Sequence, residues 1–177
     1  MSRTNPYKKK RRSASRTLLM YGEGLGEEMF LKHLRGLYSR DSGVAVTIRN
    51  GKGGTAPNIV TNAANEPGAF DRRIVILDND KNEQEMKQAR TKAREKGVEL
   101  LENSPCLEAT LLAILRAGQS FSRKTSAWCK NEFESNYLDK KKRTEIGEYD
   151  KIFPKTMLDT QRANVPELNA FISMMEH

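Results

Sequence analysis

The stretch "RRIVILDND" (72–80) decides the fold that this sequence can adopt. It is continuously apolar from Ile74 to Leu77 and then becomes polar, with acids at Asp78 and Asp80. A short apolar run without polar alternation is typical of a strand that is buried on both faces of a parallel sheet. We therefore expect a central strand that ends in two carboxylates.

The segments around this strand alternate between strand and helix patterns. Short apolar runs predict further strands at 17–24, 43–54 (which closes on a glycine loop) and 98–104. Apolar residues at helical spacing, or charged runs with helix stop signals, predict helices at 27–40, 56–66, 82–97 and 105–118, the last with Pro105 in its first turn. This alternation over residues 17–118 predicts an α/β fold, a parallel Rossmann-like sheet with helices on both faces.

The two ends of the chain differ from this central domain. Residues 1–16 have no apolar periodicity, and we expect a disordered basic arm there. Residues 119–177 are polar and only weakly periodic, with a final helix expected at 166–176. We interpret this part as a mostly helical C-terminal extension that packs on the domain.

The net charge of +8 is concentrated in the arm. Residues 1–16 hold seven of the 31 basic residues and no acid, so the remaining 24 basic residues nearly balance the 23 acidic ones. Such an arm can neutralise phosphates of a nucleic acid, or it can act only as a solubilising tail. The residues expected to bind phosphate are Lys8, Lys9, Lys10, Arg11 and Arg12.

Composition argues against several classes of protein and site. No apolar run approaches the length of a membrane span, and the N-terminus lacks the apolar region of a secretory signal. Two cysteines and two histidines are too few for a disulfide framework or a zinc site. We expect a cytoplasmic protein, with His33 on the surface and Cys106 in the core.

Acidic residues recur where strands end and helices begin. The carboxyl ends of parallel strands meet at one edge of the sheet, where ligands of such folds bind. Oxygen ligands favour Mg²⁺ or Mn²⁺, and two such ions can clamp a phosphodiester. The candidate ligands are Glu23, Glu27, Asp78, Asp80 and Glu108.

Each acidic motif also has an ordinary structural interpretation. "DND" after a strand is a common turn, and "GEGLGEE" (22–28) is compatible with a tight turn followed by a helix that begins with acids. Glu108 alone is compatible with an exposed residue near a helix end. Only the joint pattern favours a metal site.

Three segments resemble a known family. "EGLGEEMFLKHL" (23–34) is similar to the first motif of Toprim domains of the OLD and RloB-like type, with Gly26 where that family usually has threonine. "VILDND" (75–80) resembles their Asp-x-Asp motif, and "NSPCLEATLLAIL" (103–115) resembles the RloB-like Asn-Pro-Cys-Phe-Glu segment. The resemblance covers roughly residues 8–118 and includes the basic leader.

The resemblance implies a Toprim fold that binds Mg²⁺ or Mn²⁺ and cleaves nucleic acid, DNA or RNA, in phage defence or on mobile elements. It implies that Glu23 acts as general acid/base or metal ligand, with Asp78 and Asp80 as catalytic ligands of a first ion. Glu27 and Glu108 would serve a second ion or orient ligands around it. The alternatives are a non-catalytic module that binds nucleic acid or a partner, and a ribosomal-RNA maturase.

Two further segments could take part in binding. "NGKGGT" (50–55) lacks the spacing of a Walker A loop, so any ATPase of a defence system would be a separate partner. Its glycine amides and Lys52 could contact phosphate, or the segment could be a plain turn. "KKKR" (140–143) with Trp128, Tyr137 and Tyr149 is compatible with a stacking surface for nucleic acid or with an ordinary packed segment. The oligomeric state stays open.

Overall fold

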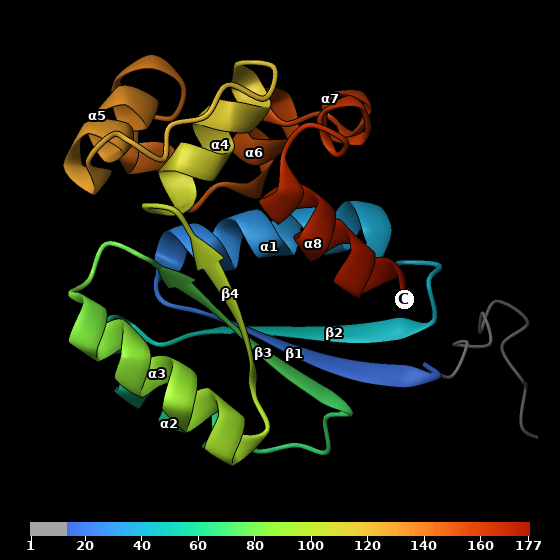
Figure 1. The fold of residues 1–177 in the computed structure, drawn as a ribbon. Helices are drawn as coiled ribbons and strands as arrows, with labels where there is room; N and C mark the ends of the chain where they lie inside the picture. Colours follow the sequence, from blue (N-terminus) through green and yellow to red (C-terminus); the bar gives the residue numbers. More distant parts are fainter. Residues whose placement is uncertain (1–13) are drawn as a thin grey trace, which may run out of the picture.

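A four-stranded parallel sheet forms the centre of the protein, as the sequence predicts. The computed structural model describes residues 14–177, and its strands run in the order β2-β1-β3-β4 (Figure 1). Their bounds are Arg16–Gly22 for β1, Val44–Asn50 for β2, Arg72–Asp78 for β3 and Glu99–Asn103 for β4. The predicted α/β class is confirmed.

Helices cover both faces of the sheet because the strands are apolar on both sides. Leu18, Met20 and Ile76 face one layer, and Leu19 and Val75 face the other. The first layer contains α1 and α4, and the second contains α2 and α3 (Figure 1). These helices span Leu25–Tyr38 (α1), Ala56–Asn65 (α2), Glu83–Lys96 (α3) and Leu107–Leu115 (α4).

The register of the strands determines which residues meet at the carboxyl edge. Gly22, the last residue of β1, lies beside Ile76 of β3, and Asp78 lies beside Asn103 of β4. The residues that follow β1 and β3 therefore emerge at the same edge, on the left of Figure 1. This edge positions the acidic residues that the sequence singled out.

The ends of α3 follow the signals in the sequence, whereas α4 is shorter than predicted at both ends. Asn82 caps α3 by accepting a hydrogen bond from the Glu85 N–H, and Gly97 ends that helix in the left-handed conformation. In contrast, α4 begins at Leu107 with Cys106 as its N-cap, so the prediction that Pro105 lies in the first turn is wrong. Pro105 instead lies in the bend between β4 and α4.

The C-terminal segment packs on α1 and α4 and shares their core. Phe153 packs edge-on against Phe30 of α1, with 5.4 Å between ring centroids, and Phe171 also packs on Phe30. Because several of its helices are short, they give little periodicity in the sequence. The segment comprises α5 (Ser126–Asn136), the 3₁₀ turn η1 (Lys140–Lys142), α6 (Ile146–Ile152), α7 (Lys155–Gln161) and α8 (Pro166–Glu176).

His33 is covered by this segment, so the prediction that it lies on the surface is wrong. Its side chain is 2 % exposed, its Nε2 lies 2.8 Å from the Phe153 carbonyl oxygen, and its Nδ1 lies 2.9 Å from an Asp150 carboxylate oxygen. Both partners come from the α6 region, more than 100 residues further along the chain. Within residues 14–177, no helix has both the length and the apolar character needed to cross a membrane.

β1 approaches the start of α1 so closely that position 22 requires glycine. A Cβ atom on Gly22 would lie 2.5 Å from the Glu27 Cβ, whereas a Cβ on Gly36 would meet no atom within 4 Å. We expect Gly22→Ala to lower the free energy of unfolding by about 1–3 kcal/mol through overpacking. The matched Gly36→Ala should raise it by up to about 1 kcal/mol, because alanine favours the helix.

Urea unfolding of both variants measures these two effects. Equal free energies of unfolding for Gly22→Ala and the parent protein would contradict the prediction. They would show that α1 shifts to admit the methyl group at no cost in stability.

Candidate metal centre

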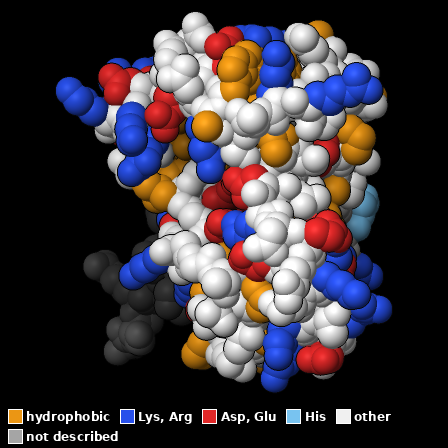
Figure 2. Space-filling model, turned by 60° about the vertical axis from the view of Figure 1, so that its left-hand side comes forward, with side chains coloured by type: hydrophobic (Ala, Val, Ile, Leu, Met, Phe, Trp, Pro, Cys, Tyr) orange, Lys and Arg blue, Asp and Glu red, His pale blue; other side chains and the backbone are white. Residues whose placement is uncertain are grey.

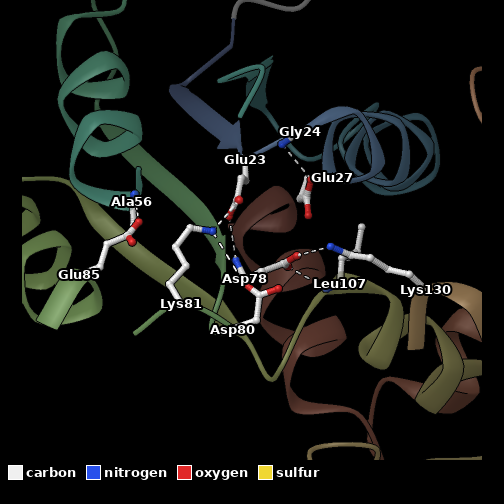
Figure 3. A network of polar contacts seen from close by, with 10 residues as sticks. All are labelled: Glu23, Gly24, Glu27, Ala56, Asp78, Asp80, Lys81, Glu85, Leu107 and Lys130. Carbon is white, nitrogen blue, oxygen red and sulfur yellow. Dashed lines mark hydrogen bonds and ion pairs between the residues drawn. The ribbon is translucent and has the colours of Figure 1, made fainter. Parts of the chain in front are cut away.

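Glu23 and Asp78 meet at the carboxyl edge of the sheet. The Asp78 backbone N–H donates a hydrogen bond to Glu23 Oε2 at 3.3 Å, although the two residues are 55 positions apart (Figure 3). Glu23 follows β1 directly, and Asp78 is the last residue of β3. The parallel pairing of these strands thus brings together two acids that the sequence predicts to be neighbours.

The Asp78 carboxylate points toward the beginning of α4. Its Oδ1 accepts a hydrogen bond from the Leu107 N–H at 2.8 Å, and the residue is 5 % exposed. Burial, followed by the charges of Glu27 and Glu108, raises the pKa of Asp78 to about 8. This carboxylate is consequently held in surroundings where its negative charge is poorly compensated.

Glu27 and Glu108 complete the acidic cluster, and Glu27 is buried while Glu108 is half-buried. Glu27 Oε2 accepts a hydrogen bond from the Gly24 N–H at 3.0 Å, which helps to fix the start of α1. Burial, and then the charges of Glu108 and Glu23, raise the pKa of Glu27. One oxygen of Glu108, Oε2, is buried and has no hydrogen-bond partner within residues 14–177.

Asp80 lies outside this buried group. It follows the end of β3, so it does not share a strand face with Asp78 as a longer strand would require. Its carboxylate is 29 % exposed and lies 3.8 Å from Lys81 Nζ. The acidic cluster therefore consists of Glu23, Glu27, Asp78 and Glu108, with Asp80 at its rim.

Two lysines that the sequence reasoning missed face the acidic cluster. Lys81 donates a hydrogen bond to Glu23 at 2.6 Å, and Lys130 of α5 lies 3.7 Å from Asp78 Oδ2 (Figure 3). Burial opposes the charge on Lys81, but the hydrogen bond to Glu23 raises its pKa. Lys81 directly follows the Asp-x-Asp motif and could have been noticed, whereas no local signal identifies Lys130.

The acidic cluster offers donor atoms of the kind that a hard divalent cation prefers. Their donors are carboxylate oxygens, the kind that Mg²⁺ and Mn²⁺ prefer, and one buried oxygen of Glu108 lacks a partner. Within residues 14–177, no three histidine, cysteine, aspartate or glutamate side chains are already grouped closely enough to hold a metal ion. In the structure, the ammonium groups of Lys81 and Lys130 compensate part of the negative charge of Glu23 and Asp78.

The glycine loop after β2 uses most of its backbone amides internally. The Gly51 N–H donates to the Gly22 carbonyl at 2.9 Å, and the Gly53 N–H donates to the Glu23 carbonyl at 3.0 Å. The Lys52 N–H donates to Asn50 Oδ1 at 3.0 Å. These bonds favour the plain turn over a phosphate cradle of backbone amides, and they hold the backbone of Glu23 in place. The Lys52 side chain is exposed.

The other predicted binding residues have different positions. Lys8, Lys9, Lys10, Arg11 and Arg12 lie outside the described residues. Tyr149 is 2 % exposed, as the packed interpretation requires, and Trp128 stacks on Phe121 with 6.0 Å between ring centroids. The four residues of "KKKR" (140–143) are exposed.

The raised pKa of Asp78 predicts how the stability of the metal-free protein depends on pH. An unfolded aspartate has a pKa of about 3.9, whereas folded Asp78 titrates at about 8. The folded state therefore binds more protons between these values, and the free energy of unfolding should fall as the pH rises through this window. Each pKa unit corresponds to about 1.4 kcal/mol, so a decrease of a few kcal/mol is expected.

Asp78→Asn removes this titration and should flatten the pH profile measured by urea unfolding in EDTA. Asp41→Asn is the control, because Asp41 is exposed. A profile for Asp78→Asn as steep as that of the parent protein would contradict the assignment.

Comparison with known proteins yields no relative on which a function could be based. No family model, no curated protein and no solved structure matches the chain. The resemblance to Toprim domains of the OLD and RloB-like type therefore stays a prediction drawn from the motifs. A function can therefore be inferred only from the geometry and charge of the acidic cluster.

Proposed function

We propose that the protein cleaves phosphodiester bonds of nucleic acid with the help of Mg²⁺ or Mn²⁺. The observation that carries the proposal is the acidic cluster at the carboxyl edge of the sheet, where Glu23 bonds to the Asp78 backbone and the charges of Glu27, Glu108 and Glu23 act on the Asp78 carboxylate. Burying like charges together is unfavourable unless a cation or protons compensate them. Ligands of parallel α/β sheets bind at this edge.

The residues of the cluster have distinct roles in this proposal. Asp78 and Glu23 are assigned to hold an ion between β1 and β3, with Asp80 reaching it from the rim. Glu27 and Glu108 are assigned to a second ion or to the water molecules around it. Glu23 also accepts or returns a proton at its carboxylate. A bound divalent ion supplies Lewis acidity and an activated water molecule.

A binding module without turnover is the second candidate, and one observation favours it. Lys81 and Lys130 already face the carboxylates that a metal ion would occupy, at 2.6 and 3.7 Å. In that case the acids and lysines form a structural network, and the basic residues hold nucleic acid or a partner such as an ATPase. Binding of nucleic acid would then be indifferent to EDTA.

The two candidates differ in their response to Mn²⁺. We expect the protein to bind Mn²⁺ in calorimetry and to cleave plasmid DNA or a labelled RNA when Mn²⁺ or Mg²⁺ is present. Asp78→Asn and Glu108→Gln should each lower the affinity for Mn²⁺ and reduce cleavage at least about a hundredfold, because each removes a ligand charge without changing side-chain size.

Glu167→Gln is the matched control, since Glu167 lies in α8 away from the cluster. Cleavage that survives in Asp78→Asn would point to a contaminating nuclease. Binding of nucleic acid without Mn²⁺ binding would support the module instead.

Competition between Lys81 and a metal ion gives a further prediction. The Lys81 ammonium occupies Glu23 Oε1, so a divalent ion has to displace it before it can use that oxygen. We expect Lys81→Met to raise the affinity for Mn²⁺ about tenfold, which corresponds to about 1.4 kcal/mol. Lys87→Met, on exposed α3, changes the net charge equally and should leave the affinity unchanged.

Calorimetric titration of both variants with Mn²⁺ measures the difference without relying on catalysis. A lower affinity in Lys81→Met would mean that Lys81 organises the carboxylates instead of competing for them.

A further inference from the structure

A small pocket opens beside Glu108, where the C-terminal segment packs against the starts of α1 and α4. It has a volume of about 80 Å³ and lies between the starts of α1 and α4, the end of α5 and the turn at 138–143. Its apolar wall comes from α4, α5 and the residues that follow α5, and its polar residues include two cations. The lining residues are Gly26, Leu107, Glu108, Leu111, Phe133, Glu134, Leu138, Lys140, Arg143 and Tyr149.

The two cations of the pocket are not engaged by acids of the protein. Within residues 14–177, no carboxylate oxygen lies within 4.0 Å of the side-chain nitrogens of Lys140 or Arg143. Both residues are exposed, whereas the neighbouring Lys142 lies 4.0 Å from Glu148. Lys140 and Arg143 are thus available to an anion from outside.

The backbone that carries these cations is fixed in place. Asp139 accepts a hydrogen bond from the Lys141 N–H at 2.8 Å, which starts η1, and the Tyr149 hydroxyl donates to the Arg143 carbonyl at 3.3 Å. Tyr149 itself is buried in the shared core. Because the backbone of the turn is already ordered, binding of a ligand has to immobilise only the two side chains.

Gly26 keeps the pocket open toward the acidic cluster. A Cβ atom at this position would lie 3.6 Å from Leu107 Cδ2 and 4.0 Å from Glu108 Oε1, in ordinary contact and without a clash. An alanine here would therefore be tolerated, and its methyl group would occupy pocket space beside Glu108. The absence of a side chain at Gly26 leaves room for a ligand.

We propose that this pocket holds a sugar–phosphate unit of the nucleic-acid strand next to the bond that is cleaved. Lys140 and Arg143 bind the phosphate, and the apolar wall around Leu111 and Phe133 accepts the carbon face of the sugar. Glu134 is the remaining acid of the lining, and it can accept a hydrogen bond from the ribose 2′-hydroxyl when the strand is RNA. Figure 2 shows acidic side chains gathered in a recess, with lysine and arginine side chains around it. This inference rests on the proposed function.

The test measures binding of labelled single strands of DNA and RNA by fluorescence anisotropy, with the full chain, in EDTA and in Ca²⁺. The double variant Lys140→Ala/Arg143→Ala should weaken binding about tenfold and reduce the slope of log K against log salt by about 0.7, since both residues contact one phosphate and each phosphate contact contributes about 0.7 on single strands. Lys87→Ala/Lys92→Ala, on the opposite face of the sheet, is the control with equal loss of charge and should retain the slope.

Gly26→Ala fills part of the pocket without changing the charge of the protein, so it tests whether the ligand occupies this space. It should weaken binding several-fold with an unchanged salt slope and an unfolding temperature that is equal or higher, because alanine favours the helix. Parent-like binding by both Gly26→Ala and the double variant would overturn the proposal, and so would a parent protein that binds neither strand.

The outcomes show whether the pocket assignment or the proposed cleavage is wrong. If the double variant binds weakly while the parent protein never cleaves with Mn²⁺, the pocket stands and the proposed cleavage fails. If the double variant binds and cleaves like the parent protein, the cleavage stands and the pocket assignment fails.

Discussion

Burial of the Asp78 carboxylate among other acids is the constraint on which the site depends. Asp78 ends the central strand of the domain, and the Leu107 N–H and the nearby Lys130 compensate only part of its charge. The pKa of Asp78 is raised to about 8 as a result. A carboxyl with this pKa is largely protonated at neutral pH, so a divalent cation that binds to it has to displace the proton.

The C-terminal segment belongs to the site as much as to the fold. Phe153 and Phe171 pack on Phe30 of α1, so the segment shares the core of the sheet domain. Through that packing it brings Lys130 to Asp78 and Lys140 to the pocket beside Glu108. A sheet domain without the segment would have an exposed apolar face on α1, and its acidic cluster would lack Lys130.

The sequence predicts the sheet and the approach of Glu23 to Asp78 because both depend on local patterns. Apolar runs end at acids in β1 and β3, and parallel strands have a common carboxyl edge, so Glu23 and Asp78 could be placed together before the structure was known. The boundary of β3 was less certain, and the strand ends at Asp78, which leaves Asp80 at the rim.

Residues whose role depends on distant packing could not be predicted in the same way. His33 looks like a surface residue on α1 until α6 covers it, and Lys130 reaches Asp78 only because α5 lies beside α4. The pocket beside Glu108 is formed by segments more than 100 residues apart. No helical or strand periodicity encodes such contacts, since periodicity identifies the buried face of an element but not the element that covers it.

Gly26 connects the local and the distant parts of the site. In the motif that the segment 23–34 resembles, this position usually carries threonine, whose side chain would lie toward Leu107 and Glu108. Here the side chain is missing, Glu108 retains an oxygen without a partner, and the space beside it forms part of a pocket with Lys140 and Arg143. A buried acceptor without a partner, such as Glu108 Oε2, is unfavourable for stability by itself. The arrangement becomes understandable if a cation satisfies this oxygen, because binding then recovers free energy that the empty protein lacks.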